Sequence, residues 1–195
     1  MHKIWRQLFR EMNIDEKKII FDCLNGDAAS YRILVDKYQH FAYTLAVRIT
    51  KNTEDAEEVT QDAFVKAYTS LSGFKGESKF STWLYKIVLN LSMSKVRRKK
   101  EAHQNIDDLN LQIEEEDDGA RKRERSFYVE KAINSLSEDE AAIVTLFYME
   151  DQSLDEISRV VELSLTNTKV KLFRARKKMA EMLKTVLKED LYSIL

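Results

Sequence analysis

The chain has 195 residues, of which 44% are hydrophobic and 33% are charged, and its formal net charge is -1. This composition excludes a membrane-spanning protein, because no apolar run approaches the roughly 20 residues that a spanning helix needs. The start, MHKIWRQLFREMN, does not contain the apolar stretch and small-residue cleavage site of a signal peptide. We therefore expect a cytoplasmic protein without membrane insertion.

The fold class follows from the scarcity of helix-breaking residues. The chain contains four glycines and no proline, which predicts an all-α protein. Shifts in composition predict two helical domains joined by a flexible acidic linker. We place an N-terminal extension at residues 1–13, the first domain at 14–100, the linker at 101–120 and the second domain at 121–195. The single cysteine, Cys23, excludes an internal disulfide.

Helical periodicity begins at residues 15–24 and 28–50, and a third helix is predicted from the KNTED break to about residue 71. Within it, the segment DAEEVTQDAFVKAY places small and apolar residues on one core-facing stripe. The opposite face carries Asp55, Glu58, Gln61, Asp62 and Val65. This run of acids contains no lysine to pair it, so we expect an exposed face that serves a partner.

A glycine-bearing loop, SGFKGESKFS, precedes a predicted helix, TWLYKIVLNLSMSKVRRKK. Residues 83–100 contain six lysines and arginines and no acid. Aromatic faces interleaved with cations suit the stacked bases of a single strand. Trp83 nevertheless has two interpretations, because it could equally pack inside a helical bundle.

The predicted linker is strongly acidic. Residues 101–118 contain eight acids and no lysine or arginine. Such a segment repels itself and has too few apolar residues to form a core. We expect it to be the only connection between the two domains, so that each domain unfolds independently of the other.

Three helix starts are predicted in the second domain. Ser137 with Glu140, and Ser153 with Glu156, match the serine-x-x-glutamate capping box, and Ser164 is a third N-cap. The short helix LDEISRVV, the break EL and a long helix from residue 165 to about 187 predict a helix-turn-helix. The core stripe of the long helix consists of Thr168, Leu172, Ala175, Met179, Leu183 and Val186.

The long helix leaves Lys169, Val170, Phe173, Arg174 and Lys177 on its outer face. In a helix-turn-helix this face enters the major groove, where arginine or lysine donates to guanine and an apolar side chain packs on a thymine methyl. The alternative is a solvated basic helix end that complements its own dipole. The capping boxes, the turn and the one-sided charge favour DNA binding.

Enzyme signatures are missing from the sequence. It contains no phosphate-binding GxxxxGKS loop, and His2, His40 and His103 stand isolated. We expect no catalysis, no cofactor and no metal.

From about residue 14 to 187 the chain resembles the extracytoplasmic-function (ECF) group of sigma-70 family sigma factors, the promoter-recognition subunits of bacterial RNA polymerase. DAEEVTQDAFVKAY is similar to the family's core-binding helix in region 2. FKGESKFSTWLYKIVLNLSMSKVRR is similar to its promoter-melting region, and SLDEISRVVELSLTNTKVKLFRARKKM to its region 4 helix-turn-helix. The resemblance implies a transcription initiation factor with region 2 in the first domain and region 4 in the second.

The resemblance also implies partners and site residues. The partners are the β and β′ subunits of core polymerase, promoter DNA and an anti-sigma factor that clamps the two domains together. The set that docks on the β′ clamp helices is Asp55, Glu58, Gln61, Asp62 and Val65. The set that binds and melts the minus-ten element is Phe74, Lys75, Lys79, Phe80, Trp83, Lys86, Asn90, Lys95, Arg97 and Arg98. The set at the minus-thirty-five element is Thr166, Asn167, Lys169, Val170, Lys171, Phe173, Arg174, Arg176 and Lys177.

The sequence departs from the family pattern in the turn of the helix-turn-helix. Glu162 stands where the family usually has glycine, and Thr166, Asn167 and Thr168 replace a common glycine-threonine-valine start. Thr166 and Asn167 can still donate hydrogen bonds to a phosphate at the helix start.

Two other functions compete with that of a sigma factor. A stand-alone helix-turn-helix regulator would bind DNA alone and would not need the face around Asp62. A helical adaptor would act only through protein contacts, and its DNA affinity would not show the salt dependence of phosphate binding.

Overall fold

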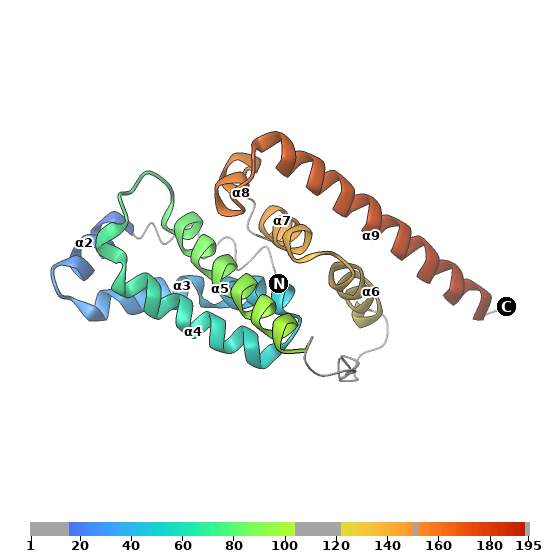
Figure 1. The fold of residues 1–195 in the computed structure, drawn as a ribbon, viewed down its shortest axis with the longest axis horizontal. Helices are drawn as coiled ribbons and strands as arrows, with labels where there is room; N and C mark the ends of the chain where they lie inside the picture. The colour runs from blue at the N-terminus through green and yellow to red at the C-terminus, as the bar shows by residue number, and fades with distance from the viewer. Residues whose placement is uncertain (1–15, 104–121, 150–151, 194–195) are drawn as a thin grey trace.

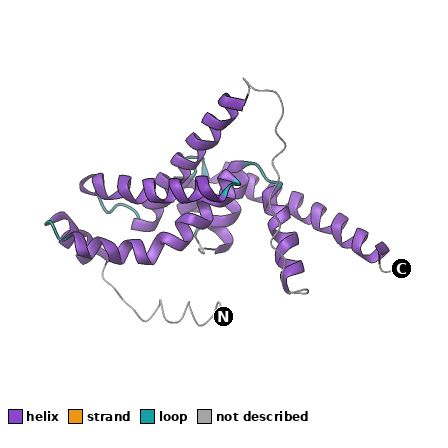
Figure 2. Ribbon diagram, turned by 90° about the horizontal axis from the view of Figure 1, so that it is seen from below, coloured by secondary structure: helices purple, strands orange, loops and turns teal. Residues whose placement is uncertain are grey.

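The computed structural model of the protein describes residues 16–103, 122–149 and 152–193 (Figure 1). All regular structure in these ranges is helical (Figure 2), which confirms the predicted all-α class. The elements are α2 (Glu16–Leu24), α3 (Ala28–Thr50), α4 (Thr53–Thr69), the 3-10 turn η1 (Leu71–Gly73), α5 (Phe80–His103), α6 (Lys122–Asn134), α7 (Glu138–Met149), α8 (Leu154–Val160) and α9 (Leu165–Ser193). The predicted extension at 1–13 and most of the predicted linker lie outside the described residues, and residues 101–103 end α5.

Helices α2 to α5 form the first unit, in which α3, α4 and α5 pack against one another (Figure 1). Local signals set their starts. The Asp27 carboxylate accepts a hydrogen bond from the Ala29 amide at 3.0 Å before α3, and the Asn52 side chain accepts one from the Asp55 amide at 2.8 Å before α4. The apolar stripes of α3 and α5 face inward, so Leu34, Leu45 and Tyr85 are completely buried.

Helices α6 to α9 form the second unit, and its predicted caps are confirmed. The Ser137 amide donates to Glu140 at 3.2 Å, and the Ser153 amide donates to Glu156 at 2.9 Å. The Asn167 amide donates to the Ser164 hydroxyl at 3.2 Å. The predicted core stripe of α9 is confirmed at Thr168, Leu172, Ala175, Met179 and Leu183, which are buried or half-buried; the side chain of Val186 lies outside the described residues.

The expectation that the linker alone connects the two units is wrong. Helix α7 packs on α3 and α8 packs on α5, so the units share one hydrophobic core (Figure 1). The physical reason lies in α7, where six consecutive residues from Ala141 to Leu146 are buried. A helix that is apolar on every side needs neighbours on every side, and α3 supplies the side that the second unit does not cover.

The capping box of α8 yields a prediction, because this helix has only seven residues. Besides the bond from the Ser153 amide, the Ser153 hydroxyl accepts a hydrogen bond from the Glu156 amide at 3.2 Å. We expect Ser153→Ala to lower the free energy of unfolding of the full chain by about 1 kcal/mol, measured by urea denaturation. Ser153→Thr, which keeps the hydroxyl, is the control and should lose much less. Equal losses in both variants would contradict a capping role.

Candidate functional site

The predicted docking face on α4 is only partly free. Glu58, Gln61, Asp62 and Val65 are exposed, but Asp55 is only 7% exposed, so its predicted exposure is wrong. Lys95 of α5 lies 2.5 Å from Glu58 and 3.8 Å from Asp55, and Lys99 also pairs with Asp55. These lysines lie more than 30 residues away in the sequence, so the pattern within α4 gave no sign of them.

Asp55 therefore has a structural role, whereas the exposed residues of α4 remain candidates for docking. The hydrogen bond to Glu58 raises the pKa of Lys95 above its ordinary value, with partial desolvation acting in the opposite direction. Lys95 was predicted to contact melted DNA, but in the structure its ion pairs join α5 to α4. Gln61, Asp62 and Val65 remain as the open part of the predicted docking face.

Two open grooves follow the seam between α3 and α4. One, of about 450 Å³, lies between Gln39, His40 and Tyr43 of α3 and Glu57, Thr60 and Gln61 of α4. The other, of about 350 Å³, is largely apolar and is lined by Ala28, Tyr31, Phe64, Val65 and Tyr68. Because residue numbers fall along α3 as they rise along α4, the grooves lie one after the other along an antiparallel seam. A partner helix laid along this seam would contact Gln61 and Val65, one in each groove.

An aromatic cluster forms where the loop after α4 meets α5. The Phe74 ring lies 5.3 Å from that of Trp83 and 5.9 Å from that of Phe80, between centroids. Phe80, predicted to contact DNA, is only 1% exposed and also packs 5.7 Å from Tyr38 of α3. This position does not fit a direct DNA contact, because the Phe80 ring is buried in the core. The Phe80 ring packs instead against the half-buried Phe74 and Trp83.

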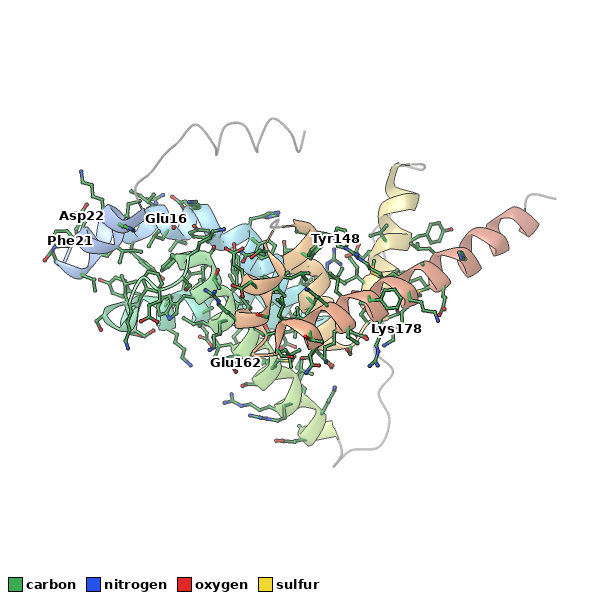
Figure 3. The ribbon with its side chains drawn as sticks, turned by 90° about the horizontal axis from the view of Figure 1, so that it is seen from above. Glu16, Phe21, Asp22, Tyr148, Glu162 and Lys178 are labelled. Carbon is green, nitrogen blue, oxygen red and sulfur yellow. The ribbon has the colours of Figure 1, made fainter. Side chains whose placement is uncertain are left out.

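Two predicted DNA-binding lysines of the first unit face acids of the second. Lys79 lies 2.7 Å from Glu156 of α8, and Lys86 lies 2.6 Å from Glu162 in the turn before α9. Figure 3 shows Glu162 where the start of α9 meets the α5 ribbon. Sequence patterns did not single out either acid as a partner of α5. Lys75, Asn90, Arg97 and Arg98 of the same predicted set are exposed.

These contacts change the ionisation of Glu156. Desolvation is the largest single influence on the pKa of Glu156 and raises it. The hydrogen bonds from Lys79 and Ser153 act against it, and together they bring the pKa of Glu156 below its ordinary value. The carboxylate is thus held in its charged form beside the α5 lysine.

The outer face of α9 presents most of the predicted minus-thirty-five set to solvent. Thr166, Asn167, Lys169, Val170, Phe173, Arg174 and Lys177 are exposed, with Phe173 at 69%. Single exposed apolar side chains are common on protein surfaces, so the exposure of Phe173 fits the predicted DNA contact without establishing it.

Three members of this set have partners within their own unit, and one of them, Lys177, lies 3.8 Å from Glu181 of the same helix. Lys171 lies 2.7 Å from Asp139 of α7, and the Arg176 guanidinium lies 5.0 Å from the ring centroid of Phe147 and 5.3 Å from that of Tyr148. Lys178 also pairs with the buried Glu140, at 2.7 Å, and Figure 3 labels Lys178 of α9 and Tyr148 of α7. Their DNA contacts stay a prediction, and the structure gives Lys171 and Arg176 packing roles in addition.

The turn of the helix-turn-helix keeps its sharp geometry without glycine. Glu162 has a φ of 54°, in the left-handed region that glycine adopts most easily. The departure from the family pattern therefore leaves the turn intact and places a charged side chain on it.

Within the described ranges, no group of three or more histidine, cysteine, aspartate or glutamate side chains is arranged to hold a metal ion. None of the described helices is both long and apolar enough to cross a membrane.

The position of Phe80 generates a testable distinction between core and contact residues. We expect Phe80→Ala to lower the free energy of unfolding by about 3–5 kcal/mol, because it empties a buried ring site. Phe80→Leu should lose about 1–2 kcal/mol and still bind single-stranded DNA as the wild type does. The exposed Asn90→Ala is the control and should unfold within about 0.5 kcal/mol of the wild type. Urea denaturation and fluorescence anisotropy measure both properties; loss of DNA affinity in a folded Phe80→Leu would contradict this assignment.

Comparison with known proteins bears on both units. The family model for sigma-70 region 2 matches residues 34–102, and that for sigma-70 region 4 matches residues 126–179. The sigma-H factor of Pseudomonas aeruginosa is 29% identical over 186 residues, covering 89% of this chain and 96% of the relative. The ECF sigma-E factor of Haemophilus influenzae is 30% identical over 163 residues, covering 77% and 86%.

Solved structures share the fold at lower identity. The sigma factor RpoE of Bartonella quintana, in complex with the anti-sigma factor NepR, superposes with a TM-score of 0.68 at 22% identity, over 79% of this chain and 96% of that chain. CnrH in complex with the cytosolic domain of CnrY gives a TM-score of 0.65 at 21% identity, over 86% and 96%. From the family matches and the relatives along most of its length, the chain belongs to the ECF sigma factors of the sigma-70 family, which direct RNA polymerase to promoters.

Proposed function

We propose that this sigma factor divides its work among three surfaces of the described structure. The α3–α4 seam docks on core polymerase, the Phe74–Trp83 end of α5 binds the melted minus-ten element, and the outer face of α9 reads the minus-thirty-five element. The observation that carries this proposal is the seam itself. A stand-alone helix-turn-helix regulator would have no use for a double groove on the unit that does not contain its helix-turn-helix.

Docking at the seam rests on shape and charge. The β′ clamp is a helical hairpin, and an exposed helix fits an apolar groove with polar margins. Val65 and Tyr68 are 64% and 42% exposed and offer the apolar contact, while Gln61 and Asp62 offer an amide and a carboxylate beside it. Asp55 has a structural role in this proposal, because its carboxylate is buried against α5.

Binding of the minus-ten element rests on the aromatic cluster and its cations. Phe74 and Trp83 are half-buried, so each ring has one packed side and one open side that could receive an extruded base. Asn90, Arg97 and Arg98 continue along α5 and would attract the backbone of a single strand. Extrusion needs a few kcal/mol of unstacking, which stacking and phosphate contacts offset.

Reading of the minus-thirty-five element rests on exposed positions spaced along one side of α9. Lys169, Phe173 and Arg174 lie in its first three turns, where a recognition helix reaches base edges. Lys177 lies one turn further and would meet phosphate.

The proposed setting completes this function. The sigma factor acts in the cytoplasm and catalyses no reaction. It also takes an anti-sigma partner, for which the solved complex of RpoE with the anti-sigma factor NepR is a precedent.

The docking proposal predicts a selective effect of charge reversal. We expect Asp62→Lys to weaken association with core polymerase by at least about tenfold without loss of helical content, because the side chain is exposed and reversal places like charges across the interface. The matched control is Asp36→Lys on α3, whose carboxylate is also exposed and pairs only loosely with Arg32, at 3.7 Å. Fluorescence titration of labelled core measures both. Wild-type affinity in Asp62→Lys would overturn the assignment of this face.

The α9 proposal predicts different behaviour for two cations on one helix. We expect Arg174→Ala to weaken holoenzyme binding by about 1–3 kcal/mol and to relax preference at one base pair, since a bidentate base contact is lost. Lys177→Ala should weaken all promoter sequences alike and reduce the slope of log affinity against log salt by about one. Binding to a panel of single-base promoter variants at several salt concentrations tests both. A uniform loss in Arg174→Ala would move that residue to the phosphate contacts.

A further inference from the structure

The exposed apolar side chains of the first unit gather at one end of it. Within residues 16–103, the large hydrophobic side chains that are exposed are Phe21, Leu24, Ile33, Val65 and Tyr68. They lie on α2, the first third of α3 and the last third of α4. Helix α2 packs on α3 and on η1, which directly follows α4, so these segments are neighbours (Figure 1). Figure 3 shows Phe21 at the end of the first unit that is farthest from the second. A group of exposed apolar side chains indicates an interaction surface where a single one does not.

Helix α2 is a fixed part of this end. Its inner face is buried, and it packs against α3. At its start, the Glu16 carboxylate accepts hydrogen bonds from the Tyr38 hydroxyl, at 2.5 Å, and from the Lys37 ammonium. Its outer face leaves Phe21 64% exposed and Leu24 51% exposed. Because the helix is already held in place, a partner can cover these two side chains without first ordering the backbone.

The apolar groove of the α3–α4 seam lies beside α2. Ala28, which follows α2 after a short turn, lines this groove together with Tyr31. Burial raises the pKa of Tyr31, and the neighbouring Cys23 of α2 raises it further. The other side of the Tyr31 ring meets Tyr68 of α4, at 4.9 Å between centroids. One tyrosine therefore has α2 on one side and the far wall of the groove on the other.

The seam alone is small for a stable protein interface. Six residues line one groove and five line the other, whereas specific interfaces use about 20–30 residues on each side. The axes of two packed helices lie about 8–10 Å apart, so a hairpin with one helix on the seam places its second helix over a neighbouring element. On one side of the seam that element is α5, which has no exposed large hydrophobic side chain in its described residues. The other side offers Phe21 and Leu24.

We propose that the core-docking surface continues from the α3–α4 seam onto α2, where Phe21 and Leu24 contact the second helix of the polymerase clamp hairpin. The partner is a helix that presents aliphatic or aromatic side chains next to the helix that fills the seam. The inference rests on the proposed function in placing the first helix of the hairpin on the seam. It gives a docking role to α2, which lies outside residues 34–102, the segment matched by the region 2 family model.

A double variant removes the apolar contact and keeps the helix. In Phe21→Gln/Leu24→Gln both new side chains are good helix formers, and both positions are exposed. We expect affinity for core polymerase, measured by fluorescence titration, to fall by at least about tenfold, because burial of even one large apolar side chain is worth that much. The matched control is Val129→Gln on α6 of the second unit, which is 43% exposed and should bind core as the wild type does.

Salt dependence separates this contact from the charged part of the docking face. The loss in Phe21→Gln/Leu24→Gln should be the same at low and high salt, because no charge is changed. The loss in Asp62→Lys should shrink as salt is added, because salt screens the repulsion.

Photocrosslinking identifies what covers α2. We replace Phe21 in the full-length chain by the photoreactive benzoylphenylalanine, assemble holoenzyme and irradiate it. The expected product is a crosslink to the β′ clamp helices, whereas the same label at Val129 should not reach them.

The outcomes separate this inference from the proposed function. Wild-type core affinity in Phe21→Gln/Leu24→Gln, or crosslinks that fall outside the β′ clamp, would overturn the role of α2. So would a free chain that self-associates through these side chains, becoming monomeric in the double variant while its core affinity stays unchanged. Asp62→Lys and Val65→Gln test the seam itself. If they also bind core normally, the proposed docking face is wrong; if they alone weaken binding, only its extension onto α2 is wrong.

Discussion

The burial of α7 on every side is the constraint on which the rest of the structure depends. Six consecutive residues of this helix, from Ala141 to Leu146, are withdrawn from solvent, and a helix of that kind cannot lie on a surface. Helices α8 and α9 cover part of it, and α3 of the first unit covers more. Leaving such a helix open would expose several aliphatic side chains, each worth about 1.5–3 kcal/mol of burial, so the burial of α7 strongly favours contact between the units.

Once α7 lies on α3, the position of the helix-turn-helix is no longer free. α8 follows α7 after a short connection and comes to rest on α5, so the acids of α8 and its turn meet the lysines at the start of α5. The apolar contact of α7 with α3 sets the position of α8 on α5. The ion pairs set how α8 is aligned along α5, because Lys79 and Lys86 lie about two helical turns apart and have partners at both ends of α8. The nearly neutral whole chain is thus assembled from oppositely charged faces.

Sequence patterns predicted what depends on neighbours along the chain. Helix periodicity, the capping boxes at Ser137 and Ser153, the core stripe of α9 and the exposed position of Phe173 all follow from spacing within one helix, and the structure confirms them. Contacts between distant segments could not be predicted from spacing within one helix. The sequence predicts that Asp55 is exposed, because Lys95 and Lys99, which cover it, lie on another helix. It likewise predicts that Phe80 contacts DNA, because the packing of its ring against Tyr38 of α3 depends on the fold.

The turn before α9 shows that one residue can affect both the local backbone geometry and a contact with a distant segment. In the sequence, Glu162 departs from the family's usual glycine, and this departure bears first on the geometry of the turn. The structure keeps the geometry, at a φ of 54°, and gives the departure a second meaning, because the side chain that glycine does not have is the one that reaches Lys86. To an ammonium group, a carboxylate and a phosphate oxygen are similar acceptors, so a lysine that can bind a DNA phosphate can also pair with an acid of its own chain. Lys79 and Lys86, which we propose bind DNA, therefore also attract acids of their own chain, and the packing of α7 on α3 brings two such acids within reach.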